Sequence, residues 1–131
     1  MNFQEKKDWE RVKFNQKFLN AFRGMYVFFR APGHFFYVHV PIYLVMIISG
    51  FYFKITEAEW LAIVFSIGLM FIAEVFNTAI EIDIDLTSPG YHPYARDTKD
   101  VAAAAVALSG VLGLIIWLII FLPKIIFYAK M

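Results

Sequence analysis

The sequence predicts an all-α integral membrane protein with a single domain over residues 1–131, made of one surface helix and three membrane-spanning helices. Hydrophobic residues make up 60% of the chain, against about 45–50% apolar residues in soluble domains. They gather into three segments, at about 35–53, 60–80 and 101–122. Each segment approaches the roughly 20 residues that a helix needs to cross a bilayer. No linker rich in Ser, Pro or Gly divides the chain, so one domain is expected.

Residues 1–31 differ from the three apolar segments because they mix seven Lys and Arg with aromatic residues. Phe18, Phe22, Met25 and Phe29 recur at i, i+4, i+7 and i+11, which places them on one face of a helix. This pattern predicts an amphipathic helix lying in the membrane interface. The alternative is a soluble helix packed on a globular core, but the three apolar segments leave no soluble core to receive it.

The distribution of charge predicts orientation and excludes one class of partner. The net charge of +1 argues against a basic field over the whole chain, so nucleic acid is not expected as a partner. Seven of the twelve Lys and Arg precede the first apolar segment, and Arg96 and Lys99 lie between the second and third. The positive-inside rule therefore places the N-terminus and the second connector in the cytoplasm.

An acidic stripe occupies the second apolar segment and its continuation. On a helix, Glu74, Asn77, Glu81 and Asp85 fall within an arc of about 80°. Asp83 falls on another side, where a solvated charge is expected. Ionisable groups at membrane depth cost about 2.5 to 3.5 kcal/mol each, so a group of them indicates a functional site. Carboxylates at the cytoplasmic end of a span are suited to a hard cation such as Mg²⁺.

Several polar residues follow the stripe. Ser88-Pro89-Gly90 predicts a turn. Tyr91, His92, Lys99 and Asp100 then lead into the third apolar segment, where a lysine can neutralise phosphate charge.

Packing is the alternative explanation for each of these features. One polar residue in a membrane helix most often joins helices by hydrogen bonds, as Asn77 or Thr78 alone would. Two glutamates on one face exceed that need, because like charges repel unless a cation or proton lies between them. Packing is the favoured explanation for His39, Pro41 and the small residues 102–105.

Specific motifs connect these features to a known family. They are E-V-F-N-T-A-I-E at 74–81, Asp85, Y-H-P at 91–93 and K-D-V-A-A-A-A-V at 99–106, together with A-F-R-G at 21–24 and Glu59-Trp60. The chain resembles the prokaryotic diacylglycerol kinase and undecaprenol kinase family over nearly its whole length. His92-Pro93 and Ala95-Arg96 look more like the undecaprenol kinases than the proteobacterial diacylglycerol kinases.

The resemblance implies a homotrimer of three-span subunits in the bacterial inner membrane. Each subunit would phosphorylate a lipid alcohol, undecaprenol or diacylglycerol, from ATP and Mg²⁺ at the cytoplasmic face. The family uses no glycine-rich phosphate loop, and this chain contains neither G-x-x-x-x-G-K-[ST] nor G-x-G-x-x-G.

The resemblance also implies roles for individual residues. Glu74 would be the general base on the lipid hydroxyl, Glu81 a ligand of the metal, and Asn77 and Asp85 residues that position groups around them. Lys99 would stabilise charge on the transferring phosphoryl group. The nucleotide would be contacted by Tyr91, His92, Lys99 and Asp100.

The chain departs from the family at one position. A second metal-binding glutamate is expected just before the first span, where this sequence has Pro32 or Gly33. Mg²⁺ can be held by one or two carboxylates plus substrate phosphates, so Glu81 can act without it. His34 is a candidate substitute ligand, against the alternative of a plain interfacial histidine, although imidazole suits Zn²⁺ or Mn²⁺ better.

Three functional hypotheses follow. The first is an active lipid kinase, and the second is a kinase-like membrane subunit that has lost turnover because of the missing glutamate. The third is an ion-coupled transporter subunit, which the lack of a broken helix or inverted repeat disfavours.

Overall fold

The computed structural model describes residues 3–31 and 35–130, with side chains described from 16 to 31 and from 37 to 130. All the elements in this part of the chain are α-helices, as the sequence predicts. The chain divides into two units, Met1–Pro32 and Gly33–Met131. The first contains α1 (Phe3–Arg30), and the second contains α2 (Phe35–Tyr52), α3 (Glu57–Thr87) and α4 (Pro93–Ala129). Pro32, Gly33 and His34, where the sequence departs from the family, lie outside the described residues.

α1 is one continuous helix that matches the segment expected from the sequence. On its predicted apolar face, Phe18, Phe22 and Phe29 are exposed and Met25 is half-buried. Phe22 alone keeps 76% of its surface accessible. Aromatic residues left uncovered along one side of a helix suit an interfacial position, so that placement of α1 stays a prediction.

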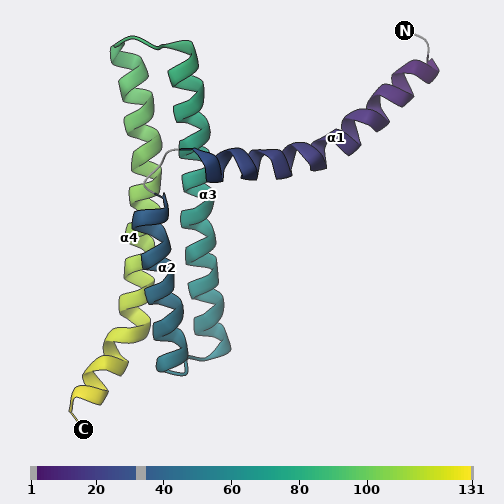
Figure 1. Ribbon diagram of the computed structural model, residues 1–131. Helices are drawn as coiled ribbons and strands as arrows, with labels where there is room; N and C mark the ends of the chain where they lie inside the picture. The colour runs from purple at the N-terminus through teal and green to yellow at the C-terminus, as the bar shows by residue number, and fades with distance from the viewer. Residues whose placement is uncertain (1–2, 32–34, 131) are drawn as a thin grey trace. The chain divides into compact units, whose positions relative to one another are not determined.

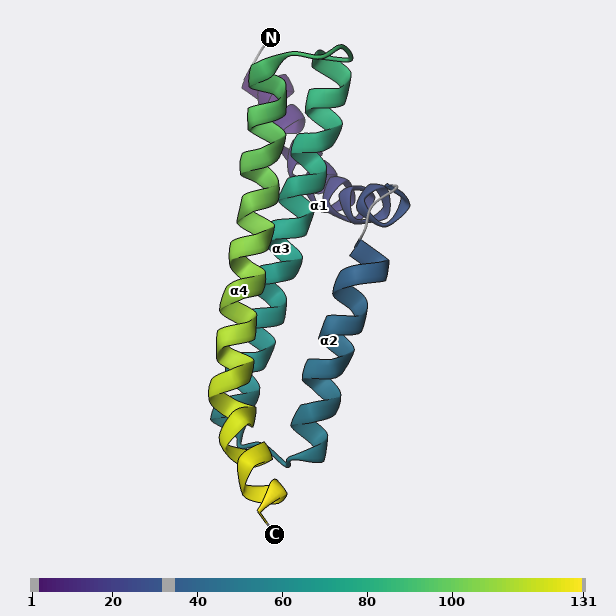
Figure 2. The ribbon, with the colours of Figure 1, turned by 90° about the vertical axis from the view of Figure 1, so that its left-hand side faces the viewer.

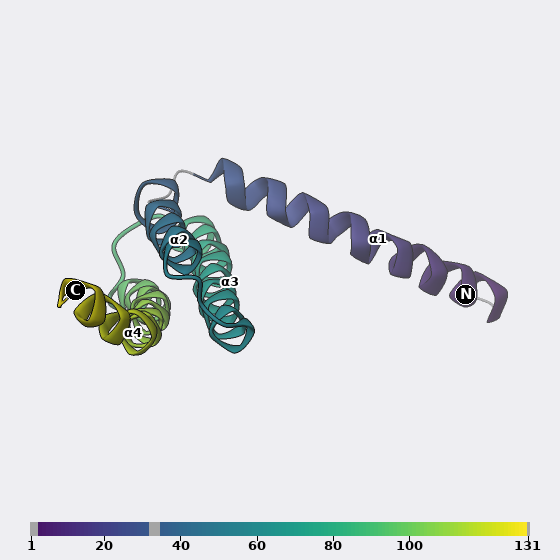
Figure 3. The ribbon, with the colours of Figure 1, turned by 90° about the horizontal axis from the view of Figure 1, so that it is seen from below.

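The helices of the second unit run antiparallel in succession (Figures 1 and 2), and the view along them shows a triangular arrangement (Figure 3). A tight connection joins α2 to α3, with Lys54 at a positive φ of 49°. Thr56 then caps α3: its hydroxyl accepts from the Glu59 N–H at 3.3 Å, and the Glu59 carboxylate accepts from the Thr56 N–H at 2.8 Å. This reciprocal capping satisfies two amides that the first helical turn leaves unpaired.

α3 and α4 are both longer than the apolar segments from which they were predicted. The segment at 60–80 is part of a 31-residue helix, and the segment at 101–122 is part of a 37-residue helix. α3 ends before Ser88, which precedes Pro89 and leaves the helical conformation, as residues before proline tend to do. α4 begins with Pro93 in its first turn, where the missing N–H is not needed. The whole acidic stripe and Lys99 therefore lie on rigid helices at one end of the bundle.

Two of the described helices, α3 and α4, are long and apolar enough to cross a membrane. The described part of α2, Tyr37–Tyr52, is apolar but shorter. Many large apolar side chains on these helices are exposed, including Phe65 and Ile119. Such a surface is typical of a protein that faces lipid or another subunit. That α2 spans the membrane as a third segment stays a prediction.

The core lies toward the end of the bundle opposite the acidic stripe. Met46, Ile55, Ile63, Ile120 and Phe121 form a buried cluster, and Ile63 and Phe121 have no exposed surface. Two glycines, Gly50 and Gly113, bring the helices close together: a Cβ on Gly50 would meet the Trp60 ring at 2.6 Å, and one on Gly113 would meet Ser66 Oγ at 2.9 Å. These approaches fix how α2 and α4 are rotated against α3.

Candidate active site

Glu74 is the most enclosed carboxylate of the stripe. Its side chain is buried, with 8% of the residue surface exposed, and it points toward α2. There its Oε1 lies 2.9 Å from Nδ1 of His39, which is equally buried. This contact joins two helices, which is the packing role expected of His39, and it also places the imidazole at the stripe. No spacing pattern signals this pairing, because 35 residues separate His39 from Glu74.

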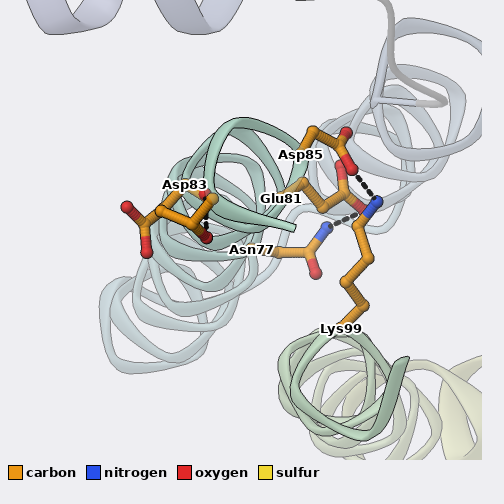
Figure 4. Close-up of polar contacts among 6 residues, drawn as sticks. Asn77, Glu81, Asp83, Asp85 and Lys99 are labelled. Carbon is orange, nitrogen blue, oxygen red and sulfur yellow. Dashed lines mark hydrogen bonds and ion pairs between the residues drawn. The ribbon is translucent and has the colours of Figure 1, made fainter. Parts of the chain in front are cut away.

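Asn77 and Glu81 follow Glu74 on the same face of α3, as the helical spacing predicts. Asn77 Nδ2 donates a hydrogen bond to Glu81 Oε1 at 3.1 Å, and both residues are half-buried. The other polar atom of the amide, Asn77 Oδ1, is buried and has no hydrogen-bond partner among the described residues. The amide nitrogen of Asn77 thus faces the carboxylate, while its oxygen points to the other side of the amide (Figure 4).

Lys99 connects the stripe to α4. Its Nζ lies 2.5 Å from Asp85 Oδ1, across the two helices. Figure 4 shows the ammonium group beside both Asp85 and Glu81, while Asp83 points to another side of α3. Lys99 precedes the apolar segment at 101–122. Its hydrogen bond to Asp85 raises the pKa of its ammonium group, and the charge of Glu81 contributes in the same direction. The lysine is therefore a permanent cation at neutral pH.

Three other residues expected at the site are not brought to the stripe. Tyr91 and His92 are exposed in the connector before α4. Asp100 pairs with Arg96 on its own helix, at 3.5 Å, and not with a residue of α3. A contact of Tyr91, His92 and Asp100 with nucleotide stays a prediction. Asp83 is exposed, as expected.

The donor set suits a magnesium ion that shares its ligands with substrate. Within residues 3–31 and 35–130, no group of three or more His, Cys, Asp or Glu side chains lies close enough to hold a metal. The Glu81 carboxylate, held by the Asn77 amide, is a hard oxygen donor of the kind that Mg²⁺ prefers. Mg²⁺ commonly binds through one or two carboxylates and completes its shell with phosphates and water.

An apolar groove of about 630 Å³ lies between the three helices of the second unit. All of its lining residues are apolar, and they include Pro41 of α2, Met70 of α3 and Gly110 of α4. Met70 is one helical turn before Glu74, and Pro41 is two residues after His39. Glu74 and His39 do not line the groove themselves, but residues within one helical turn of each of them do.

Comparison with known proteins supports a kinase site. The family model for prokaryotic diacylglycerol kinase matches residues 19–121. The chain is 39% identical to the undecaprenol kinase of Bacillus subtilis over 116 residues, which are 88% of this chain and 94% of that protein. It is 32% identical to a diacylglycerol kinase of Helicobacter pylori over 62% of this chain and 60% of that protein. It is 34% identical to the diacylglycerol kinase of Escherichia coli K12 over 42% of this chain and 45% of that protein.

No solved structure matches the chain. The match over residues 19–121 includes α2, α3 and α4 as far as residue 121, and so contains every residue of the stripe and Lys99. Membership is therefore shown for the part of the chain that carries the site. The protein belongs to the prokaryotic diacylglycerol kinase family and is a lipid kinase.

Proposed function

We propose that this enzyme transfers the terminal phosphoryl group of ATP to the hydroxyl of a membrane lipid alcohol, with undecaprenol as the favoured acceptor and diacylglycerol as the alternative. The relative that this chain covers over 94% of its length is named an undecaprenol kinase, which supports undecaprenol over diacylglycerol. The observation that carries the proposal is the position of Glu74: the carboxylate is buried next to an apolar groove, one turn from a polar cluster that contains a lysine.

The groove and the carboxylate suit a lipid that carries one reactive hydroxyl. An acyl or prenyl chain would lie among the apolar side chains of the groove, with its hydroxyl group near Glu74. Because one carboxylate oxygen is held by His39, the second oxygen, Oε2, is the atom that would accept the hydroxyl proton. The lipid oxygen would then form its bond to the γ-phosphorus of ATP as ADP departs.

The polar cluster suits the phosphates. Glu81 and Asn77 lie one to two turns beyond Glu74, at most about 10 Å along the helix axis. Glu81, positioned by Asn77, would hold Mg²⁺, which neutralises phosphate charge when it is bound. Lys99 would leave Asp85 or reach past it to stabilise negative charge on the transferring group. Phosphoryl transfer needs mainly alignment and positive charge, and this arrangement supplies both.

The membrane arrangement belongs to the same proposal. The connector of residues 88–92 and the N-terminus would face the cytoplasm, where ATP is available, with α2, α3 and α4 crossing the bacterial inner membrane. Three copies would assemble through the apolar surfaces that a single copy leaves exposed. Nucleotide contacts from Tyr91, His92 and Asp100 would form in that assembly with substrate bound.

The test is transfer of labelled phosphate from ATP to undecaprenol and to diacylglycerol in mixed micelles, with and without Mg²⁺. Glu74→Gln keeps the shape of the side chain but removes the base, so we expect turnover to fall about 10²- to 10⁴-fold. Asp83→Asn is the matched control, because Asp83 is on the same helix and points away from the site. It should keep near-normal turnover.

Each outcome identifies a different state of the protein. Label on one lipid, lost in Glu74→Gln and kept in Asp83→Asn, supports the kinase and selects its substrate. Unchanged turnover in Glu74→Gln would exclude its role as the base. If the folded wild-type protein labels neither lipid, the silent kinase-like subunit replaces the proposal, and Pro32 or Gly33 in place of the family glutamate becomes its explanation.

A further inference from the structure

The contact between His39 and Glu74 is the only ion pair within the described residues in which both side chains are about 90% buried: 10% and 11% of their side-chain surfaces are exposed. The other three pairs in that part of the chain, Arg96–Asp100, Lys99–Asp85 and Lys124–Glu59, are more exposed. Burying a carboxylate without a donor is unfavourable, so a residue that supplies one determines where the carboxylate lies. His39 has that position relative to Glu74.

We propose that His39 is a positioning residue for the reaction: its imidazole, with Nδ1 at 2.9 Å from Oε1 of Glu74, holds that oxygen and leaves Oε2 for the lipid hydroxyl. This inference rests on the proposed function and deepens it. The distance of 2.9 Å between Nδ1 and Oε1 is that of an ion pair, with the imidazole ring packed against the carboxylate. His39 acts through Glu74 and does not touch the reacting atoms.

The arrangement has a consequence for the orientation of the base. A glutamate side chain has three rotatable bonds, and α3 alone cannot fix the direction of its carboxylate. A donor on a second helix can fix it, because the position of α2 against α3 is set independently by the close approach of Gly50 to Trp60. Catalytic geometry must be held within roughly 0.5 Å and 10–20°, and such support from a neighbouring element provides it.

The place of His39 at the groove supports the same role. Pro41 and Ile42, which follow it on α2, line the apolar groove, and so does Met70, one turn before Glu74 on α3. The pair therefore lies within about one helical turn of the groove. A lipid chain in the groove would bring its hydroxyl to the carboxylate that His39 holds, and water would have little access to the pair.

The experiment compares substitutions that differ only in what they donate. His39→Asn places an amide nitrogen the same number of bonds from the backbone as Nδ1, so it can donate to Glu74. His39→Leu has similar bulk and donates nothing. Ser66→Ala is the control, because it removes another buried polar group of the bundle, two turns before Glu74 and outside the site. kcat and the KM values for lipid and ATP are measured for each folded variant in mixed micelles.

We expect His39→Leu to lower kcat about 10- to 100-fold, with both KM values changed less than about threefold, because the base is misdirected while substrates still bind. His39→Asn should restore kcat to within about threefold of wild type. Ser66→Ala should change kcat by less than about twofold. A residue with only a packing role would give the opposite order, since leucine packs better than asparagine in an apolar site.

The outcomes separate this inference from the proposed function. If the wild type labels no lipid, the proposed function fails. If the wild type is active and Glu74→Gln is not, but His39→Leu retains its kcat or His39→Asn is no better than His39→Leu, only the positioning role is overturned. If His39→Leu does not fold, His39→Gln replaces it: its amide lies one bond too far, and activity equal to that of His39→Asn would overturn the proposal.

Discussion

Replacing Gly50 by alanine tests the packing that places α2, and with it His39, against α3. An added Cβ would lie 2.6 and 2.8 Å from two atoms of the Trp60 ring, where ordinary contacts begin at 3.4 Å. The ring would have to retreat by roughly 0.8 Å. It has little freedom to do so, because it packs on Phe51 at a ring separation of 4.9 Å and on the buried cluster.

Two opposing effects determine the size of the change. Overpacking a filled site costs about 1–3 kcal/mol. Alanine in place of glycine within a helix stabilises by about 1 kcal/mol. Gly50→Ala should therefore lower the free energy of unfolding by about 0–2 kcal/mol. Gly68→Ala is the matched control: Gly68 is inside α3 and has nothing within 4 Å of its Cβ position, so this change should raise the free energy of unfolding by up to about 1 kcal/mol.

The assay is reversible unfolding in mixed micelles with increasing denaturing detergent, followed by circular dichroism and by tryptophan fluorescence. The quantity of interest is the difference between the two variants, because the helix-propensity effect cancels in it. We expect Gly50→Ala to be less stable than Gly68→Ala by about 1–3 kcal/mol. Equal stabilities would show that Gly50 and Trp60 do not approach each other as described, and would remove the support for the position of α2.

Two further changes test the site. Lys99→Met removes the cation beside Asp85 and Glu81, and should lower kcat about 10²- to 10³-fold in the phosphate-transfer assay. The control Lys124→Met, at the other end of α4, should change kcat less than about threefold. Equal effects of the two changes would contradict a specific role of Lys99 in the transfer. Gly110→Leu adds a side chain in the groove, where the nearest atom to a new Cβ is Met70 Cε at 3.9 Å, and should raise the KM for lipid about tenfold without changing the KM for ATP. An unchanged KM for lipid would place the lipid chain elsewhere.

Figure 4 illustrates how much of the site could be predicted from local spacing. Asn77 and Glu81 are four residues apart on one helix, so their hydrogen bond follows from helical geometry alone. The outward direction of Asp83 follows in the same way. The ends of α3 and α4 were harder to predict, because the length of an apolar segment predicts only the part of a helix that lies in hydrocarbon. Both helices continue until backbone constraints at Ser88-Pro89 and Pro93 interrupt them.

The sequence by itself determined the helical class, the apolar segments, the acidic face of α3 and the family, because each depends on residue type and on spacing along one chain segment. Only the tertiary structure decided that His39 meets Glu74, that Lys99 meets Asp85, and that an apolar groove lies between the three helices within a turn of the buried carboxylate. These pairings depend on how each helix is rotated about its axis and displaced along it. Close approaches such as Gly113 to Ser66 set that rotation, and no periodicity within a single helix encodes it.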